Sequence, residues 1–271
     1  METQAYNPAR FATYARRTAA VNSAYMLRLL KPGMRVLDVG CGPGSITAGL
    51  APLVAPGGSV VGIDANADAL DSARELCKQQ GVTNASFSLG DALKLPFEDN
   101  SFDVVHAHQV LGHLPTADGE LGPIRGLKEM RRVCKPGGFI CAREVEWSSI
   151  TIYPSIQGVI DAIALIAMIA NSDGKTQAGG RGREFARKAG FKPEDITASS
   201  SAVTYANKAD REWWGGNMAA RLESSLALEK GVKLGFVTEE TAAQIPDAWK
   251  EWAEHADGFC SMIDGEIICR K

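Results

Sequence analysis

The sequence lacks the features by which several classes of protein are recognised. Its 271 residues carry a formal net charge of −3, so no basic excess marks a nucleic-acid-binding surface. Its six cysteines are scattered, with no Cys-x-x-Cys pair and no Cys/His spacing that suits zinc. We therefore expect reduced thiols, no metal site and no nucleic-acid partner.

Long hydrophobic runs are also missing. The longest, 159–170, contains Asp161 and is too short to span a bilayer. The first residues include Glu2 and lack the apolar stretch of a secretory signal. These observations predict a protein without a membrane span that is located in the cytoplasm.

The chain does contain a regular alternation of short apolar runs and helical patterns between residues 30 and 145. Alternation of this kind is typical of a parallel sheet with crossover helices. There are too few units for an eight-stranded barrel, so the pattern predicts a doubly wound α/β fold. The expected strands are 35–39, 59–63, 85–89, 102–107 and 139–145, and the expected helices are 45–54, 66–80 and 121–133.

The chain after Trp147 is less regular. Its patterns predict helices at 155–170, 179–189, 209–229 and 238–255, and strands at 196–205 and 259–269. Four tryptophans fall in the last two helices. They could clamp an aromatic ligand, but tryptophans at helical spacing belong more often to a hydrophobic core.

A glycine-rich turn, Asp38-Val-Gly-Cys-Gly-Pro-Gly44, follows the first expected strand. Glycines between a strand and a helix let the backbone approach a nucleotide-like ligand, and the helix offers free N–H groups. The spacing is Gly-x-Gly-x-Gly, with Ser45 where a dinucleotide-binding turn needs glycine. Asp38 would repel a pyrophosphate but suits a cofactor that carries a cationic amino group.

Two further carboxylates follow neighbouring strands. Asp64, 20 residues beyond Gly44, could accept hydrogen bonds from both hydroxyls of a ribose. Asp91 follows the third strand and could accept from an adenine amino group, or simply cap a loop. Asp64 supports adenosine binding without selecting between nicotinamide and methyl-donor cofactors.

Five segments in order and at the usual spacing resemble the successive motifs of class I S-adenosylmethionine (SAM)-dependent methyltransferases. They are Val36–Gly44, Val61–Asp64, Gly90–Phe97, Phe102–Val105 and Arg132–Gly138. The resemblance is strongest to the ubiquinone- and menaquinone-biosynthesis type and its small-molecule relatives. It implies SAM as cofactor and a Rossmann-like sheet of seven strands in the order 3-2-1-4-5-7-6, with strand seven antiparallel.

The resemblance also implies where the cofactor lies. Gly40 and Gly42 would line its methionine part, Asp64 its ribose, and Asp91 with Ala92 its adenine, while the backbone of His108 would face its amino group. Tyr14 and Arg17 fall in the segment that relatives fold over the cofactor, although Arg17 could equally be a surface residue. The full set of expected cofactor-binding residues is Tyr14, Arg17, Asp38, Gly40, Gly42, Asp64, Ala65, Asp91, Ala92 and His108.

Methyl transfer needs positioning above all, and a base where the acceptor is a hydroxyl or a carbon acid. His113, after the fourth strand, resembles the histidine that some relatives use as a base. Glu144 and Glu146 end the fifth strand on one face and could support it, so we expect these three residues to be catalytic. The alternative is that they only shape the pocket, and we expect His106 to be a core histidine.

These observations predict one methyltransferase domain, 1–271, with lid helices at 1–30, a SAM-binding core at 31–147 and a helical insertion at 208–256 over the substrate site. The expected function is methyl transfer to O, N or C of a small acceptor, for which aromatic compounds and natural products are the candidates. The alternative is a SAM-binding enzyme that does not methylate, such as a cyclase or a pericyclase-like enzyme. A homodimer is compatible with this interpretation.

Overall fold

The protein is built on one mixed sheet of seven strands, in the order β3-β2-β1-β4-β5-β7-β6. The computed structural model describes residues 8–172, 177–223 and 226–271. The first five strands in the sequence are parallel, and β7 runs antiparallel to both of its neighbours. The strands are β1 Arg35–Val39, β2 Ser59–Asp64, β3 Ala85–Leu89, β4 Phe102–His108, β5 Cys134–Tyr153, β6 Ile196–Tyr205 and β7 Phe259–Arg270. The predicted fold class is confirmed.

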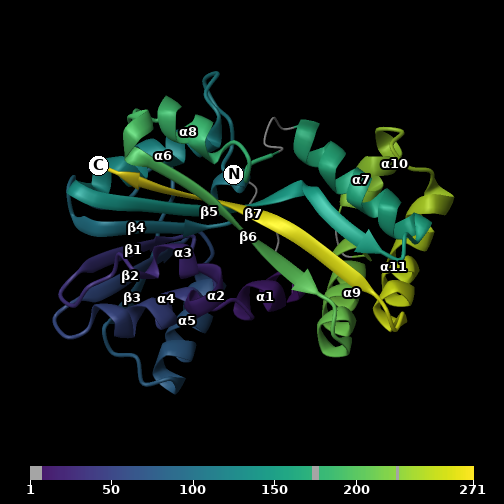
Figure 1. Cartoon of the computed structure of the whole chain (residues 1–271), viewed down its shortest axis with the longest axis horizontal. Coiled ribbons are helices and arrows are strands. Elements are labelled where there is room, and N and C mark those ends of the chain that lie inside the picture. Colours follow the sequence, from purple (N-terminus) through teal and green to yellow (C-terminus); the bar gives the residue numbers. More distant parts are fainter. Residues whose placement is uncertain (1–7, 173–176, 224–225) are drawn as a thin grey trace.

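Helices cover both faces of this sheet (Figure 1). The helices α6 and α8 lie on one face, and α2, α3, α4 and α5 lie on the other. The helices before β4 are α1 Pro8–Ala15, α2 Ala19–Asn22, α3 Ala24–Leu27, α4 Ser45–Leu50 with the 3-10 turn Ala51–Val54, and α5 Ala67–Gln79. The later ones are α6 Gly122–Val133, α7 Gln157–Ser172, α8 Gly182–Lys188, α9 Lys208–Glu223, α10 Ala227–Lys233 and α11 Glu239–Glu254, with short 3-10 turns at Leu111–His113 and Pro193–Asp195.

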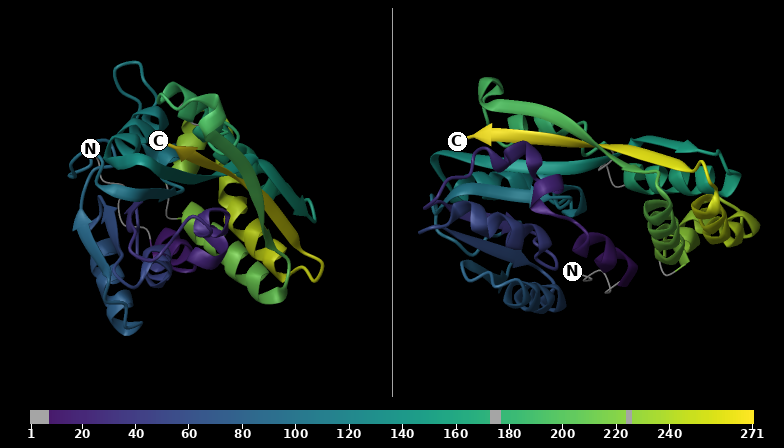
Figure 2. Two further views of the ribbon diagram at one scale, coloured as in Figure 1. Left: turned by 60° about the vertical axis from the view of Figure 1, so that its left-hand side comes forward. Right: turned by 60° about the horizontal axis from the view of Figure 1, so that its bottom comes forward.

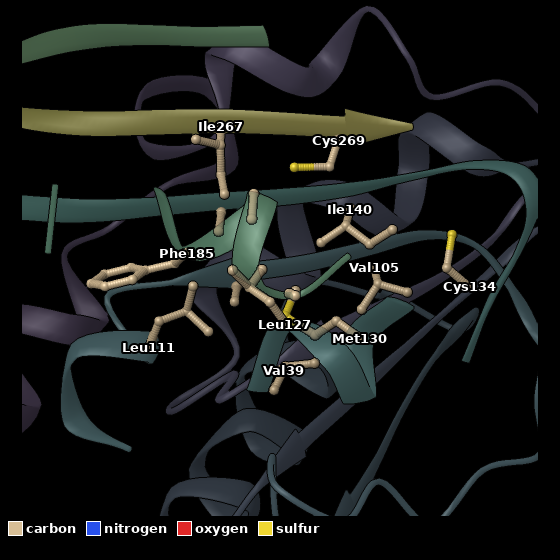
Figure 3. Close-up of a cluster of buried hydrophobic side chains, with 14 of the residues drawn as sticks. Val39, Val105, Leu111, Leu127, Met130, Cys134, Ile140, Phe185, Ile267 and Cys269 are labelled. Atoms are coloured by element: carbon tan, nitrogen blue, oxygen red, sulfur yellow. The ribbon is translucent and has the colours of Figure 1, made fainter. Parts of the chain in front are cut away.

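A hydrophobic core fills the space between the sheet and the helices α6 and α8 (Figure 3). Alternate residues of the inner strands supply it, because successive side chains of a strand point to opposite faces. Val39, Val105 and Ile140 come from the sheet, and Leu127 and Phe185 come from the two helices. The other face of the same strands packs on α2–α4 through a separate cluster.

The glycine-rich turn between β1 and α4 explains why the chain can enter the helix where it does. Gly44 precedes α4 with a φ of +76°, and a Cβ placed on it would lie 2.6 Å from the Cβ of Ala73. Glycine alone meets both conditions without strain. The turn therefore aligns α4 behind β1, with its first N–H groups toward the carboxyl end of the sheet.

Three predicted boundaries were wrong. The fifth strand was expected at 139–145 but runs from Cys134 to Tyr153, because Cys134 pairs with Phe102 of β4 before the expected start and Thr151–Tyr153 pair with β7 after the expected end. The helix expected at 179–189 begins only at Gly182, since two glycines, which disfavour helix, precede it. The helix expected at 209–229 also differs: α9 covers Lys208–Glu223, residues 224–225 lie outside the described ranges, and a separate helix, α10, begins after a turn at Leu226.

The long strands β5, β6 and β7 extend beyond the nucleotide-binding half and carry a second core (Figure 2). The helices α7, α9, α10 and α11 pack there, with α9–α11 inserted between β6 and β7. Trp214, Trp249 and Trp252 are buried in this core. The core interpretation of these tryptophans is confirmed. No helix within the described ranges has the length and apolar character needed to cross a bilayer.

Candidate active site

A cavity of about 590 Å³ opens at the carboxyl ends of the parallel strands, where open α/β sheets bind their ligands. The structure places every predicted cofactor-binding residue on its wall, together with His113: Tyr14, Arg17, Asp38, Gly40, Gly42, Asp64, Ala65, Asp91, Ala92 and His108. Phe11, Gln109, Val110, Leu114 and Pro115 also line it and were not predicted. Glu144 and Glu146, which were expected to be catalytic, do not line this cavity.

The glycine turn and Asp64 form one rigid side of this cavity. Gly40 has a φ of +67°, and a Cβ there would lie 2.4 Å from a methyl group of Val110. The N–H groups of Gly42 and Asn66 donate to the two oxygens of Asp64, at 2.8 and 2.9 Å. Burial raises the pKa of this carboxyl, and these N–H groups oppose the rise. Each oxygen keeps a further lone pair, so Asp64 can still accept from a diol.

Asp38 belongs to a buried polar chain beneath the turn. It is the direct neighbour of His106 across β1 and β4. One carboxylate oxygen is 2.8 Å from Nδ1 of His106, and the other accepts from the hydroxyl of Thr47 at 2.5 Å. Nε2 of His106 is 3.1 Å from the hydroxyl of Ser23, between α2 and α3. The prediction that His106 is a core residue is confirmed, since its side chain is fully buried.

His108 and Arg17 form the end of the cavity nearest the N-terminal segment. The Arg17 guanidinium donates to the side-chain oxygen of Gln109 and lies 4.7 Å from the centre of the Tyr14 ring. His108 is 5% exposed, and neither ring nitrogen has a hydrogen-bond partner among the described residues. Burial lowers the pKa of His108 well below its usual value, and Arg17 and Arg143 lower it further. The imidazole is therefore neutral.

Glu144 holds the turn that carries His113. Its carboxylate accepts from the N–H groups of Val110 at 2.8 Å and Leu111 at 2.7 Å, with a longer contact of 3.4 Å from Gly112. Burial raises the pKa of Glu144 to about 7, against the opposing effect of these donors. Glu144 thus fixes the backbone immediately before His113, whose side chain is exposed at the cavity wall.

Glu146 lies farther along β5 and serves a different segment. It accepts from the N–H of Gly180 at 3.0 Å and from the hydroxyl of Ser148 at 2.6 Å. It therefore ties the chain entering α8 to the strand, outside the cavity.

Asp91 is exposed on the wall of the cavity. Its side chain accepts from the N–H of Leu93 at 2.8 Å and so also closes its own loop.

The N-terminal helix α1 lies beside α9 (Figure 1), and its Phe11 and Tyr14 line the cavity. Thr13 donates to Asn217, and Arg16 forms a 2.6 Å ion pair with Asp210. The main-chain oxygen of Tyr14 accepts from Ser45 at the start of α4. Residues 11–17 therefore bridge the glycine turn and the helical insertion. The structure does not describe residues 1–7, which belong to the predicted lid of 1–30.

The architecture agrees with comparisons to known proteins. A family described as a methyltransferase domain matches residues 30–176, more than half of the chain. An uncharacterized methyltransferase of Schizosaccharomyces pombe is 35% identical over 269 residues, which cover 96% of this chain and 92% of the relative. The chain is a class I SAM-dependent methyltransferase.

Two further proteins are similar to part of the chain or to its fold. The demethylmenaquinone methyltransferase of Staphylococcus aureus is 37% identical over 124 residues, 46% of this chain and 48% of the relative. The structure of a phosphoethanolamine N-methyltransferase of Haemonchus contortus in complex with SAM matches this fold with a TM-score of 0.58 at 18% identity. The match covers 99% of this chain and 58% of that chain. SAM is the cofactor of the methyltransferase, as predicted.

Proposed function

We propose that this methyltransferase acts on a small-molecule acceptor that enters between α1 and the turn at His113. The observation that carries the proposal is that ten cofactor-binding residues predicted from motifs and His113 surround a single cavity. A volume of about 590 Å³ is within the range of small-molecule and cofactor sites. The natural-product acceptor and the cytoplasmic location remain predictions, as does the homodimer.

The residues present fit SAM. A Cβ on Gly42 would meet no other atom closer than 4.0 Å, so the glycine leaves a backbone-lined space that a side chain would fill. Asp64 would hold the ribose hydroxyls, and Ala65, Asp91 and Ala92 would surround the adenine. Asp38 and the backbone of His108 would face the amino group, and Arg17 the carboxylate. When bound, SAM supplies an electrophilic methyl group on a sulfonium sulfur.

The protein's own contribution is to position the acceptor and take up its proton. His113 is exposed at the cavity wall, so we assign it the role of general base toward an acceptor that must lose a proton. Glu144 acts through the backbone of the turn and is a positioning residue. Glu146 positions the segment at Gly180, and neither carboxylate contacts the acceptor.

We further propose that the insertion, 208–256, limits the acceptor side of the site within a single domain of 1–271. Its helix α9 contacts α1 through Asn217 and Asp210. Trp213 is the only half-buried tryptophan among the described residues of the insertion. The guanidinium of Arg16 lies over its ring, 4.5 Å from the ring centre. The insertion therefore fixes the lid rather than presenting its buried tryptophans to the acceptor.

Calorimetric titration with S-adenosylhomocysteine (SAH) tests the cofactor assignment. We expect Asp64→Asn to weaken binding by roughly 10- to 100-fold, because a hydrogen bond to a charged group contributes about 1.5–3 kcal/mol. Asp71→Asn is the matched control, since Asp71 is exposed on α5 and its side chain pairs only with Arg74 among the described residues. Equal affinity of the two variants would contradict the assignment.

Transfer of radiolabelled methyl groups to an acceptor panel tests the role of His113. His113→Ala should lower kcat by about 10²- to 10⁴-fold, the usual contribution of a general base, while the affinity for SAH stays the same. The exposed His255 at the end of α11 provides the control substitution His255→Ala. Unchanged turnover of His113→Ala would remove the base assignment.

A further inference from the structure

Most polar side chains of the cavity already have partners within the protein. Asp38 is bound by His106 and Thr47, and Asp64 is bound by two N–H groups. The oxygen of Gln109 accepts from Arg17. His108 differs, because its imidazole lines the cavity at 5% exposure while both ring nitrogens lack a partner within the described part of the chain.

A buried polar group without a partner is costly, and nearly all such groups in proteins are satisfied by a ligand, by water or by the chain itself. The surrounding contacts leave the N–H of the His108 ring without an acceptor among the described residues. His108 is paired with Arg143 across β4 and β5, and Arg143 is already bound to Asp264 at 2.8 Å. Both neighbouring cations are donors, so neither can accept from the ring.

The charges around His108 restrict the kind of ligand that can approach. The acidic residues on the cavity wall lie in β1, at the end of β2, in α5 and after β3: Asp38, Asp64, Asp68 and Asp91. The charged groups that act most on the His108 ring are Arg17 and Arg143. An ammonium group hydrogen-bonded to this ring would meet like charge, whereas the amino group of SAM would lie against the backbone of His108 and Asp38.

We propose that His108 is a specificity-determining residue that hydrogen-bonds the methyl acceptor, and that the acceptor is a hydroxyl compound such as a phenol or an enol rather than an amine. The inference rests on the methyl transfer proposed above and names the substrate class of that site. A neutral imidazole has one N–H donor and one accepting nitrogen, which suits a hydroxyl group better than a cation.

The chemistry balances with the residues at hand. The acceptor's hydroxyl proton passes to His113, from which it reaches water because that side chain is exposed. A lone pair of the acceptor oxygen forms the new C–O bond, and the electron pair of the broken C–S bond remains on sulfur. The N–H of His108 donates to the oxygen as it becomes negative. The products are a methyl ether and SAH.

Ligand-observed NMR on the complex with SAH tests this assignment without turnover. The probes are phenols and benzylamines matched ring by ring, each titrated into the SAH-saturated protein. We expect the phenols to bind and the amines to give no signal. His108→Phe should weaken phenol binding by about tenfold, because one hydrogen bond is lost, while the affinity for SAH changes less than about threefold. His255→Phe is the matched control.

Several outcomes would overturn the inference. They are equal binding of phenols by wild type and His108→Phe, preferential binding of amines, binding of no phenol to the SAH complex, and a loss of SAH affinity as large as the loss of phenol affinity. The last would make His108 a cofactor residue. Failure of the wild type to bind SAH at all would instead refute the proposed function, so the two failures are distinguishable.

Discussion

Replacement of Glu144 by glutamine removes a titration that burial and hydrogen bonding influence in opposite directions. Burial raises the pKa of Glu144 from 4.5 to about 7, although three backbone N–H groups favour the ionised form. The folded state therefore binds this proton more tightly than the unfolded state. Its stabilising effect is complete below about pH 4.5 and is lost as the pH rises through about 7.

The size of the effect follows from the shift. A difference between 4.5 and about 7, at 1.36 kcal/mol per unit, corresponds to about 3 kcal/mol. Urea unfolding of wild type and Glu144→Gln across this pH range should show the wild type losing about 3 kcal/mol relative to the variant as the pH rises. Glutamine keeps an oxygen for the N–H groups of Val110 and Leu111, so the turn at His113 should persist.

Two results would contradict the burial effect on Glu144. The difference in unfolding free energy between wild type and Glu144→Gln could stay constant with pH, or it could shift in favour of the wild type as the pH rises. The second result would mean that the three N–H groups outweigh burial and that the carboxylate is held ionised. Glu146→Gln provides the control, because Glu146 is less buried and donors from Gly180 and Ser148 hold it elsewhere.

Two further substitutions test the structure around the cofactor. Gly40→Ala should destabilise the protein by about 1–3 kcal/mol and weaken SAH binding, because the new Cβ would lie 2.4 Å from Val110 at a φ of +67°. Gly33 has a φ of +86° but open space around it, so Gly33→Ala should lower the free energy of unfolding by only about 1 kcal/mol. Thermal unfolding and SAH titration compare them, and equal losses would contradict the contact. His106→Ala should cost about 2–4 kcal/mol in urea unfolding by leaving Asp38 buried with one bond fewer, and a loss under about 0.5 kcal/mol would show that the bond contributes little.

The nucleotide-binding half could be predicted because its signals are local. The turn from Gly40 to Gly44 and the carboxylate at Asp64 act within a few residues of the strands that carry them, so spacing along the chain fixes their relation in space. The seven-strand order came from the family resemblance rather than from any single segment. The strand order is confirmed, and Asp64 lies at the turn, where it accepts from the N–H of Gly42.

The relations that the sequence did not predict depend on register between distant segments. Glu144 contacts N–H groups more than 30 residues earlier in the chain, and this contact requires the pairing of β4 with β5. The partner of Asp38 is likewise set by the neighbouring strand, at His106. The tryptophans of the insertion allowed two interpretations until the full length of β5 and β7 showed that they face a core.

The length of β5 and β7 also constrains how the molecule can move. Both strands belong to the cofactor-binding half and to the second core, and hydrogen bonds join them from Phe139 to Tyr153 apart from one irregularity. A relative rotation of the two halves would have to twist a continuous antiparallel ribbon, because no single flexible joint separates them. We therefore expect the short segment 11–17, rather than a hinge between the two halves, to admit the acceptor, while β5 and β7 tie the tryptophan core to the cofactor-binding half.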